Sequence, residues 1–282
     1  MMKKYIKLMR VKHYVKNILI FVPLFFSKSM FESDKIRWAA VGFLAFCFAC
    51  SAVYIFNDLQ DAEKDRLHAI KKNRPIACGE VSYKTACVFI FVCIMLTIGC
   101  NYFTSNPGEG ALYLFGYLIL NIWYSMGLKN MPILDVIILS CGFILRLLYG
   151  AMITQIEVSG WLYLTIFSAT FYLGLGKRRN EWKEQAAGIT RDVLLDYTFD
   201  FLDKNMYVFL GLTDTFYALW AIEQPEQGTV WTVPIVMVIL MKYSFDIEGD
   251  SDGDPVEVVL KDKWLIVLGI LYSICMYLLL YV

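Results

Sequence analysis

Apolar residues in this chain come in long runs, and the polar and charged residues fall mainly between those runs. An α-helix of about 20 largely apolar residues can cross the hydrocarbon core of a bilayer. The pattern therefore predicts nine membrane-spanning helices, the first of which is interrupted by Pro23. They cover residues 15–31, 36–57, 84–103, 110–127, 132–154, 159–176, 205–222, 229–245 and 262–282.

The composition agrees with a membrane protein. Hydrophobic residues make up 58% of the 282 residues and charged residues 18%, and the mean hydropathy is +0.53. Soluble domains have about 45–50% apolar and about 25% charged residues. We therefore expect an all-α fold, a polytopic membrane helix bundle that forms a single domain over residues 1–282. The net charge is zero, so the composition does not indicate a nucleic-acid partner.

The distribution of Lys and Arg predicts the orientation of this bundle, because cytoplasmic segments of membrane proteins carry an excess of them. With nine spans, 22 of the 26 Lys and Arg residues fall on the side of the N-terminus, and three fall on the other side. Those three are Lys28, Lys35 and Arg37, while Arg146 lies within the fifth span. We therefore expect a multi-pass protein of the plasma membrane with a cytoplasmic N-terminus. No small-residue cleavage site follows the long basic N-terminal stretch, so we expect no cleavable signal peptide.

The eight cysteines do not indicate a metal site. Cys47 and Cys50 have the CxxC spacing, but they lie in the middle of an expected span, and no second pair or nearby histidine completes a zinc site. We interpret the cysteines as small residues of the helix-packing core.

An acidic cluster ends the second span, within the sequence IFNDLQDAEKD. Asn57, Asp61 and Asp65 are spaced four apart, so a continuing helix places them on one face, and Asp58 lies three residues before Asp61. Like charges at this spacing repel, and a divalent cation is the simplest way to offset them. Carboxylate and amide oxygens suit Mg²⁺, so these four residues are the predicted metal ligands. The alternative is an ordinary solvated helix end.

A basic group follows the acidic cluster. It consists of Lys71, Lys72 and Arg74, with Pro75 and Gly79 shaping the turn. Cytoplasmic charge bias alone accounts for such a group. Cations next to a metal-binding carboxylate cluster are also what a diphosphate needs, since Lys and Arg can take the oxygens that the metal leaves.

Further charged candidates lie at the ends of other spans and inside one. Lys177, Arg178 and Glu181 follow the sixth span, with Lys177 and Glu181 one helical turn apart. Arg146 is the one charge deep in an apolar run, where it needs an anion, a cavity or an interhelical hydrogen bond.

Two more segments contribute candidates. Lys16 and Asn17 open the first span, after the basic residues Arg10 and Lys12. The acidic segment 243–262 superficially suggests a calcium loop, but a proline stands where the sharp-turn glycine belongs. We expect this segment to be a loop over the site, with Asp246 nearest to the membrane.

These stretches resemble a known family. NDLQDAEKD and the following KKNRPIACG resemble the first aspartate-rich motif of the UbiA superfamily of membrane prenyltransferases. More narrowly, MRVKHYVKN, DVIILSCGFILRLLYGA, GKRRNE and the 246–262 loop resemble the decaprenyl-phosphate phosphoribosyltransferase branch. Typical members of the superfamily carry a second aspartate motif after the sixth span, and this sequence has Lys177-Arg178-x-x-Glu181 there instead.

The resemblance implies a Mg²⁺-dependent transfer of 5-phosphoribosyl from phosphoribosyl diphosphate to a polyprenyl phosphate lipid. Asn57, Asp58, Asp61 and Asp65 are then expected to hold the metal. The basic group at 71–74 is expected to bind the diphosphate. The protein as a whole is expected to be surrounded by membrane lipids.

Other residues receive expected roles from the same resemblance. Lys177 and Arg178 are expected to bind a phosphate of the sugar, with Glu181 orienting them or binding ribose hydroxyls. Lys16, Asn17, Arg146 and Asp246 are further substrate-binding candidates without a finer assignment. A phosphate monoester needs no strong general base, and His13 and His68 are the only histidines. The branch also allows a homo-oligomer, such as a trimer.

Two rival functions stay open. A prenyltransferase that uses a prenyl diphosphate donor and an aromatic or other small acceptor shares the first motif, but it favours a second acidic motif. A transporter or channel needs polar residues spread along its spans at bilayer depth. Here the spans are largely apolar and the charges gather at one end of them.

Overall fold

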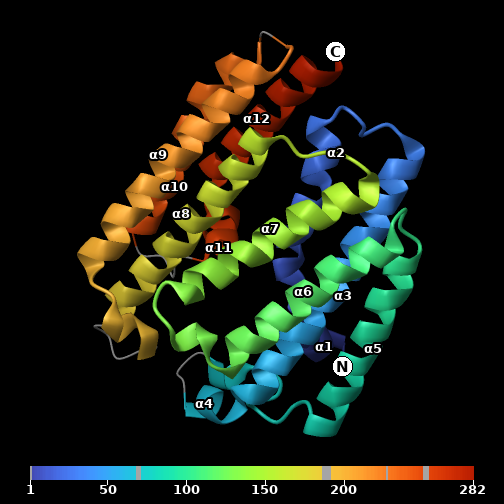
Figure 1. Ribbon diagram of the computed structural model, residues 1–282. Coiled ribbons are helices and arrows are strands. Elements are labelled where there is room, and N and C mark those ends of the chain that lie inside the picture. The colour runs from blue at the N-terminus through green and yellow to red at the C-terminus, as the bar shows by residue number, and fades with distance from the viewer. Residues whose placement is uncertain (1, 68–70, 186–191, 227, 250–253) are drawn as a thin grey trace. The chain divides into compact units, whose positions relative to one another are not determined.

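The computed structural model describes residues 2–67, 71–185, 192–226, 228–249 and 254–282, and within these ranges it is helical with no β-strand (Figure 1). The all-α prediction is thereby confirmed. The chain divides into two compact units. The first consists of Met1–Leu128 and Leu145–Glu157, and the second of Lys129–Ile144 and Val158–Val282. The single-domain prediction stays untested.

The first unit is built around the long helix α3, which packs closely against α5. Its elements are α1 (Met2–Met9), the 3₁₀-helix η1 (Val11–Phe21), α2 (Val22–Phe26), α3 (Ser33–Gln60), α4 (Ala62–Leu67), the 3₁₀-turn η2 (Lys71–Asn73), α5 (Tyr83–Tyr102), α6 (Pro107–Met126) and the later part of α7 (Leu134–Thr154). A further 3₁₀-turn, η3 (Leu128–Asn130), leads toward α7. Ser82 caps α5 by accepting a hydrogen bond from the Thr85 backbone N–H at 3.2 Å.

The first expected span differs from a regular helix. Residues 15–31 form the end of η1, the five-residue α2 and a turn instead of one continuous α-helix. Pro23 explains the break, because proline has no N–H to continue a helix and is best tolerated in the first turn of a new one. Gly150 of α7 lies against η1, and a Cβ there would meet the Ile20 backbone, with the Ile20 Cα at 2.8 Å. The close approach of these two backbones requires glycine.

The second unit is organised around α8 and α9, which run side by side over much of their lengths (Figure 1). Its elements are the first part of α7, α8 (Gly160–Gln185), the 3₁₀-turn η4 (Asp192–Asp196), α9 (Phe199–Glu223), the 3₁₀-turn η5 (Thr229–Thr232), α10 (Val233–Glu248), α11 (Pro255–Lys261) and α12 (Lys263–Tyr281). Its core is rich in buried aromatic side chains, among them Tyr172, Tyr197 and Tyr243.

Five of the described helices are long and apolar enough to cross a membrane. They are Ser33–Gln60, Tyr83–Tyr102, Leu134–Thr154, Thr229–Glu248 and Lys263–Tyr281. Each coincides with an expected span, and α6, α8 and α9 also occupy expected positions without being among the five. The multi-pass character follows from these helices, while the count of nine and the orientation of the N-terminus stay predictions.

Candidate active site

The acidic cluster lies where α3 gives way to α4. α3 ends at Gln60, and Asp61 takes a non-helical conformation with φ −93° and ψ 4°. The backbone nevertheless keeps the helical spacing, because the Asp61 N–H donates to the Asn57 carbonyl at 2.9 Å and the Asp65 N–H to the Asp61 carbonyl at 2.8 Å. The predicted continuous helix is therefore interrupted at one residue, yet the four-residue repeat of polar side chains is preserved.

Two carboxylates of this cluster converge on one guanidinium. Nη1 of Arg74 lies 3.2 Å from Asp58 Oδ1 and 2.6 Å from Asp65 Oδ2. Nη2 of Arg10 lies 2.5 Å from the same Asp58 oxygen. The Asp58 side chain is only 2% exposed, whereas both arginines are about a quarter exposed. The two buried acidic groups thus share Arg74, Asp58 has Arg10 as a second partner, and both arginines are more exposed than the acids.

The remaining members of the predicted metal-binding set lie close by in the chain. Ser125 of α6 donates a hydrogen bond to Oδ1 of Asn57, and Asp61 is half-buried. Within the described residues, no three His, Cys, Asp or Glu side chains are gathered as a metal-binding group. The Arg74 nitrogen nevertheless lies within 3.2 Å of oxygens of both Asp58 and Asp65, so these two carboxylates contact one cation together.

The basic group occupies the segment after α4. Lys71 is half-buried, Lys72 is exposed, and Arg74 faces the acidic cluster. Gly79 has φ +81°, which is the left-handed region that favours glycine and lets the chain turn back toward α5. His68, one of the two histidines, lies outside the described residues.

Arg146 of α7 is enclosed by the first unit and is only 4% exposed. Its Nε donates to Asn17 Oδ1 at 2.7 Å, and its Nη2 donates to the Tyr117 hydroxyl at 3.1 Å. The guanidinium also stacks over Phe46 and Tyr117, with centroid distances of 5.1 and 4.9 Å. These contacts favour the interhelical hydrogen-bonding role that is the alternative to substrate binding for Arg146, and they engage Asn17 in the same contact.

Arg178 of α8 is the best-enclosed cation among the described residues of the second unit, at 1% exposed. Its Nε donates to Oδ2 of Asp135, and its Nη1 donates to Glu181 Oε2 at 2.5 Å. Asp135, at the start of α7, is fully buried, and its other oxygen accepts a hydrogen bond from the Tyr197 hydroxyl at 2.7 Å. Burial raises the pKa of Tyr197 above its ordinary value, and the neighbouring Asp135 raises it further.

The neighbouring cations of this unit are paired with acids of the 246–262 segment. Lys177 Nζ lies 2.9 Å from Oδ2 of Asp254. Lys242 of α10 bridges Asp246 and Asp262, and the Asp262 carboxylate lies at 2.7 Å. Hydrogen bonds from Lys242 and from backbone N–H groups lower the pKa of Asp262 below its ordinary value. Asp246, a predicted substrate-binding residue, is therefore placed beside a lysine of its own helix.

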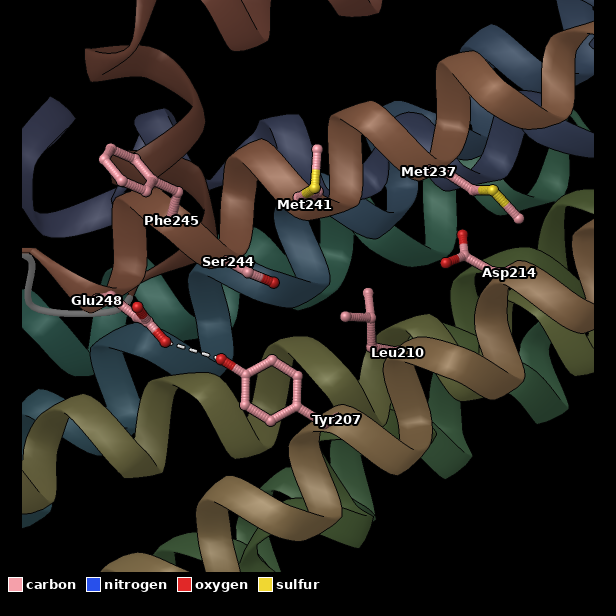
Figure 2. Close-up of a pocket in the computed structure, with 8 residues that line it drawn as sticks. All are labelled: Tyr207, Leu210, Asp214, Met237, Met241, Ser244, Phe245 and Glu248. Carbon is pink, nitrogen blue, oxygen red and sulfur yellow. Dashed lines mark hydrogen bonds between the residues drawn. The ribbon is translucent and has the colours of Figure 1, made fainter.

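A groove of about 470 Å³ separates parts of α9 and α10 (Figure 2). Figure 2 shows Asp214 pointing from α9 toward Met237 of α10, and the Tyr207 hydroxyl donating to Glu248 at 2.7 Å. One Asp214 oxygen is buried and has no hydrogen-bond partner within the described residues. The groove therefore differs from the ion-paired clusters around Arg74 and Arg178, because it has a mixed polar and apolar lining and a carboxyl oxygen without a described partner.

Several contacting residues were not among the predicted site residues. They include Ser125, Asp135, Tyr197, Asp254, Tyr117 and Lys242. The sequence gives only a weak indication that Asp135 is a site residue, because it is an acid at the start of the otherwise apolar run DVIILSCG. Such an acid is ordinarily explained by the helix dipole, so the sequence alone does not point to Arg178 as its partner.

Comparison with known proteins gives a consistent picture. The sequence pattern of the UbiA prenyltransferase family matches residues 20–183 of this chain. A decaprenyl-phosphate phosphoribosyltransferase from Corynebacterium glutamicum is 31% identical, over 98% of this chain and 86% of the relative. One from Mycolicibacterium smegmatis is 30% identical, over 93% of this chain and 88% of the relative.

A solved structure with the same fold is that of a UbiA homologue from Archaeoglobus fulgidus bound to GPP and Mg²⁺. Its TM-score is 0.76, and the match covers 99% of this chain and all of that chain at 19% sequence identity.

Proposed function

Because the chain belongs to the UbiA prenyltransferase family, we propose that it transfers 5-phosphoribosyl from phosphoribosyl diphosphate to a polyprenyl phosphate and releases pyrophosphate. Membership of the family confirms the resemblance that the sequence NDLQDAEKD indicated. The relatives named decaprenyl-phosphate phosphoribosyltransferase match nearly the whole chain, which supports this choice of reaction.

The observation that carries the proposal is the cationic cluster on α8. By resemblance, a prenyl diphosphate enzyme has carboxylates at this position for a second metal. Here Arg178 is buried between Asp135 and Glu181, and Lys177 lies beside it in the chain with Asp254 as its partner. Cations at this position suit a phosphate that no metal bridges, and the 5-phosphate of phosphoribosyl diphosphate is such a group.

The acidic cluster of the first unit supplies the proposed metal site. Asp58, Asp61 and Asp65 offer carboxylate oxygens and Asn57 offers an amide oxygen, which together form the hard donor set that Mg²⁺ prefers. Asp58 and Asp65 already share one cationic nitrogen of Arg74, which supports their joint use. The Mg²⁺ in the Archaeoglobus fulgidus structure supports a divalent ion for the fold. When bound, the ion would neutralise charge on a diphosphate.

The chain's own residues would then act by binding and by charge. Arg74, Lys71 and Lys72 would contact the diphosphate and stabilise the negative charge that develops as pyrophosphate leaves. An oxygen of the polyprenyl phosphate forms the new bond to the anomeric carbon, and the bond from that carbon to the pyrophosphate oxygen breaks. The attacking oxygen is already anionic, so no general base is required.

Several finer assignments stay proposals. We place the reaction at the cytoplasmic face of the plasma membrane, following the distribution of Lys and Arg. Lys16 and Asp246 are retained as candidates for the lipid phosphate and the sugar. Arg146 and Asn17 are better explained as partners of each other, given the 2.7 Å contact between them. A homo-oligomer also remains a prediction.

The test is a transfer assay on membranes that contain the protein. Labelled phosphoribosyl diphosphate and polyprenyl phosphate are incubated with and without Mg²⁺, and label entering the organic phase is counted. We expect transfer only with the metal, and we expect Asp61→Asn to abolish it while expression is unchanged. Pyrophosphate released only from a prenyl diphosphate, with an aromatic or other small acceptor, would favour the rival prenyltransferase instead.

A further inference from the structure

The carboxylate of Asp135 is fully occupied inside the second unit. One oxygen accepts from Nε of Arg178 and the other from the Tyr197 hydroxyl at 2.7 Å, and the side chain has no exposed surface. An ionised pair without access to water is stable only when its remaining hydrogen-bonding positions are satisfied. Asp135 meets that condition, so it is a permanent partner of Arg178.

Glu181 is a different kind of partner for the same guanidinium. It lies one turn beyond Arg178 on α8, accepts from Nη1 at 2.5 Å, and its side chain is 23% exposed. Glu181 is therefore partly in contact with solvent, whereas Asp135 is not. Nε of Arg178 is held by a fully buried acid, and Nη1 is held by a partly exposed one.

Tyr197 connects this pair to the chain on both of its sides. Its hydroxyl donates to Asp135 and accepts from the Ile133 backbone N–H at 2.5 Å, so both of its hydrogen-bonding functions are used. Ile133 has φ +69°, which a β-branched residue adopts only when surrounding contacts hold it. The Tyr197 carbonyl accepts from Trp182 Nε1 of α8 at 3.0 Å. The turn before α7 is thereby tied to the helix that carries Arg178.

We propose that Asp135, supported by Tyr197, is a positioning residue that fixes the Arg178 guanidinium so that its Nη1 edge exchanges Glu181 for a phosphate monoester of the substrate. The proposal rests on the proposed function, in which that phosphate is the 5-phosphate of phosphoribosyl diphosphate. Asp135 does not contact the substrate, and its effect is transmitted entirely through the orientation of Arg178.

The test compares two donors that differ only in the 5-phosphate, phosphoribosyl diphosphate and ribose 1-diphosphate. For Asp135→Asn we expect the KM for phosphoribosyl diphosphate to rise by about 10–100-fold, by analogy with the range found when the supporting partner of a metal-binding side chain is removed. The KM for polyprenyl phosphate should stay within about two-fold. With ribose 1-diphosphate, the variant and the wild type should give equal kcat/KM, since no 5-phosphate is present to lose its contact.

A matched control exists on the same helix. Arg179 donates from its own Nε to Asp203 Oδ1 at 2.5 Å, so Asp203→Asn removes an acid from a neighbouring pair that uses the same Nε contact, with an acid that is 28% exposed. We expect Asp203→Asn to leave both donors unaffected. An equal rise in KM for both donors in Asp135→Asn, or the same rise in Asp203→Asn, would overturn the positioning role.

A second variant covers the case in which Asp135→Asn does not fold. Tyr197→Phe keeps the ion pair and removes one hydroxyl, and it should raise the KM for phosphoribosyl diphosphate selectively by a smaller factor, about 3–10-fold. An unchanged KM in a folded Tyr197→Phe protein contradicts the proposal. If the wild-type protein transfers nothing from phosphoribosyl diphosphate, the proposed function is wrong. If the wild type is active but the variants change KM equally for both donors, only the positioning role is wrong.

Discussion

Arg74→Ala tests whether the acidic cluster of the first unit accepts a metal in place of a guanidinium. In the structure Arg74 forms an ion pair with Asp65 and also with Asp58. Asp58 has a second cation partner, Arg10. The substitution leaves a buried carboxylate without that cation. Stability should fall in the absence of metal and return when Mg²⁺ takes the vacated position.

The magnitude follows from the burial of the two partners. Removing one member of a fully buried ion pair costs about 3–5 kcal/mol, and exposed pairs are worth about 0–1 kcal/mol. Asp65 is 6% exposed and Arg74 is 25% exposed, so the pair lies between these limits, and we expect a loss of about 2 kcal/mol. At about 2–4 °C per kcal/mol, this corresponds to a fall in Tm of about 4–8 °C.

The assay is thermal unfolding of the purified protein in detergent, with Mg²⁺ titrated against a chelator-treated sample. A ligand at about 100 times its Kd stabilises the state it binds by about 2.7 kcal/mol, which is enough to offset the loss in Arg74→Ala. The wild type should gain less from Mg²⁺, because the metal must first displace Arg74. Stability is measured here without any substrate, so the result does not depend on the transfer reaction.

Two variants make the Arg74 experiment decisive. In Arg74→Ala/Asp65→Asn the uncompensated charge is gone, so stability should recover without metal and the response to Mg²⁺ should shrink. Arg66→Ala removes a cation from the same segment whose described partner is the Ala77 carbonyl at 3.3 Å, and it should change Tm little. The reasoning is refuted if Arg74→Ala unfolds at the wild-type temperature, or if Mg²⁺ stabilises Arg66→Ala as much as Arg74→Ala.

Three further outcomes are expected. Gly150→Ala should destabilise the protein by about 1–3 kcal/mol in thermal unfolding, because the new Cβ meets the Ile20 backbone, whereas Gly99→Ala in open surroundings should be neutral or slightly stabilising. Asp214→Leu should raise Tm, because it removes a partly buried carboxyl whose Oδ1 has no described partner, and a lower Tm would contradict this reading of the groove. Removing Mg²⁺ with a chelator should stop the transfer reaction, and restored Mg²⁺ should recover it, as counted by label in the organic phase.

The fold was largely predictable because its main signal is local. Runs of about 20 apolar residues predict spanning helices without any knowledge of tertiary contacts, and the five most apolar helices coincide with expected spans. The irregular geometry at 15–31 is also local in origin. Pro23 predicts an interruption, but hydropathy carries no information on whether the chain around it adopts α- or 3₁₀-geometry.

The site was predictable only where the partners are close in sequence. Asp58, Asp65 and Arg74 lie within 17 residues, and the structure brings them together. Arg178 and Asp135 are separated by 43 residues, and a one-dimensional pattern cannot indicate which buried acid meets which buried base. The position of Arg146 inside an apolar run indicates correctly that its side chain has a polar partner, but it does not indicate which residue that partner is.

The two ion-paired clusters differ in which partner is accessible, and this difference suits the groups they are proposed to bind. At Asp58 the acid is 2% exposed and the arginines are partly exposed, so a cation can be exchanged while the acid stays. At Arg178 the base is 1% exposed and the accessible partner is Glu181, so an anion can be exchanged while the base stays. Exchange of a cation at one cluster and of an anion at the other is what a metal-bound diphosphate and a metal-free phosphate monoester require. A transporter of one ion has no need for both polarities, so the opposite accessibility of the two clusters, each taken by itself, favours the proposed transfer reaction over transport.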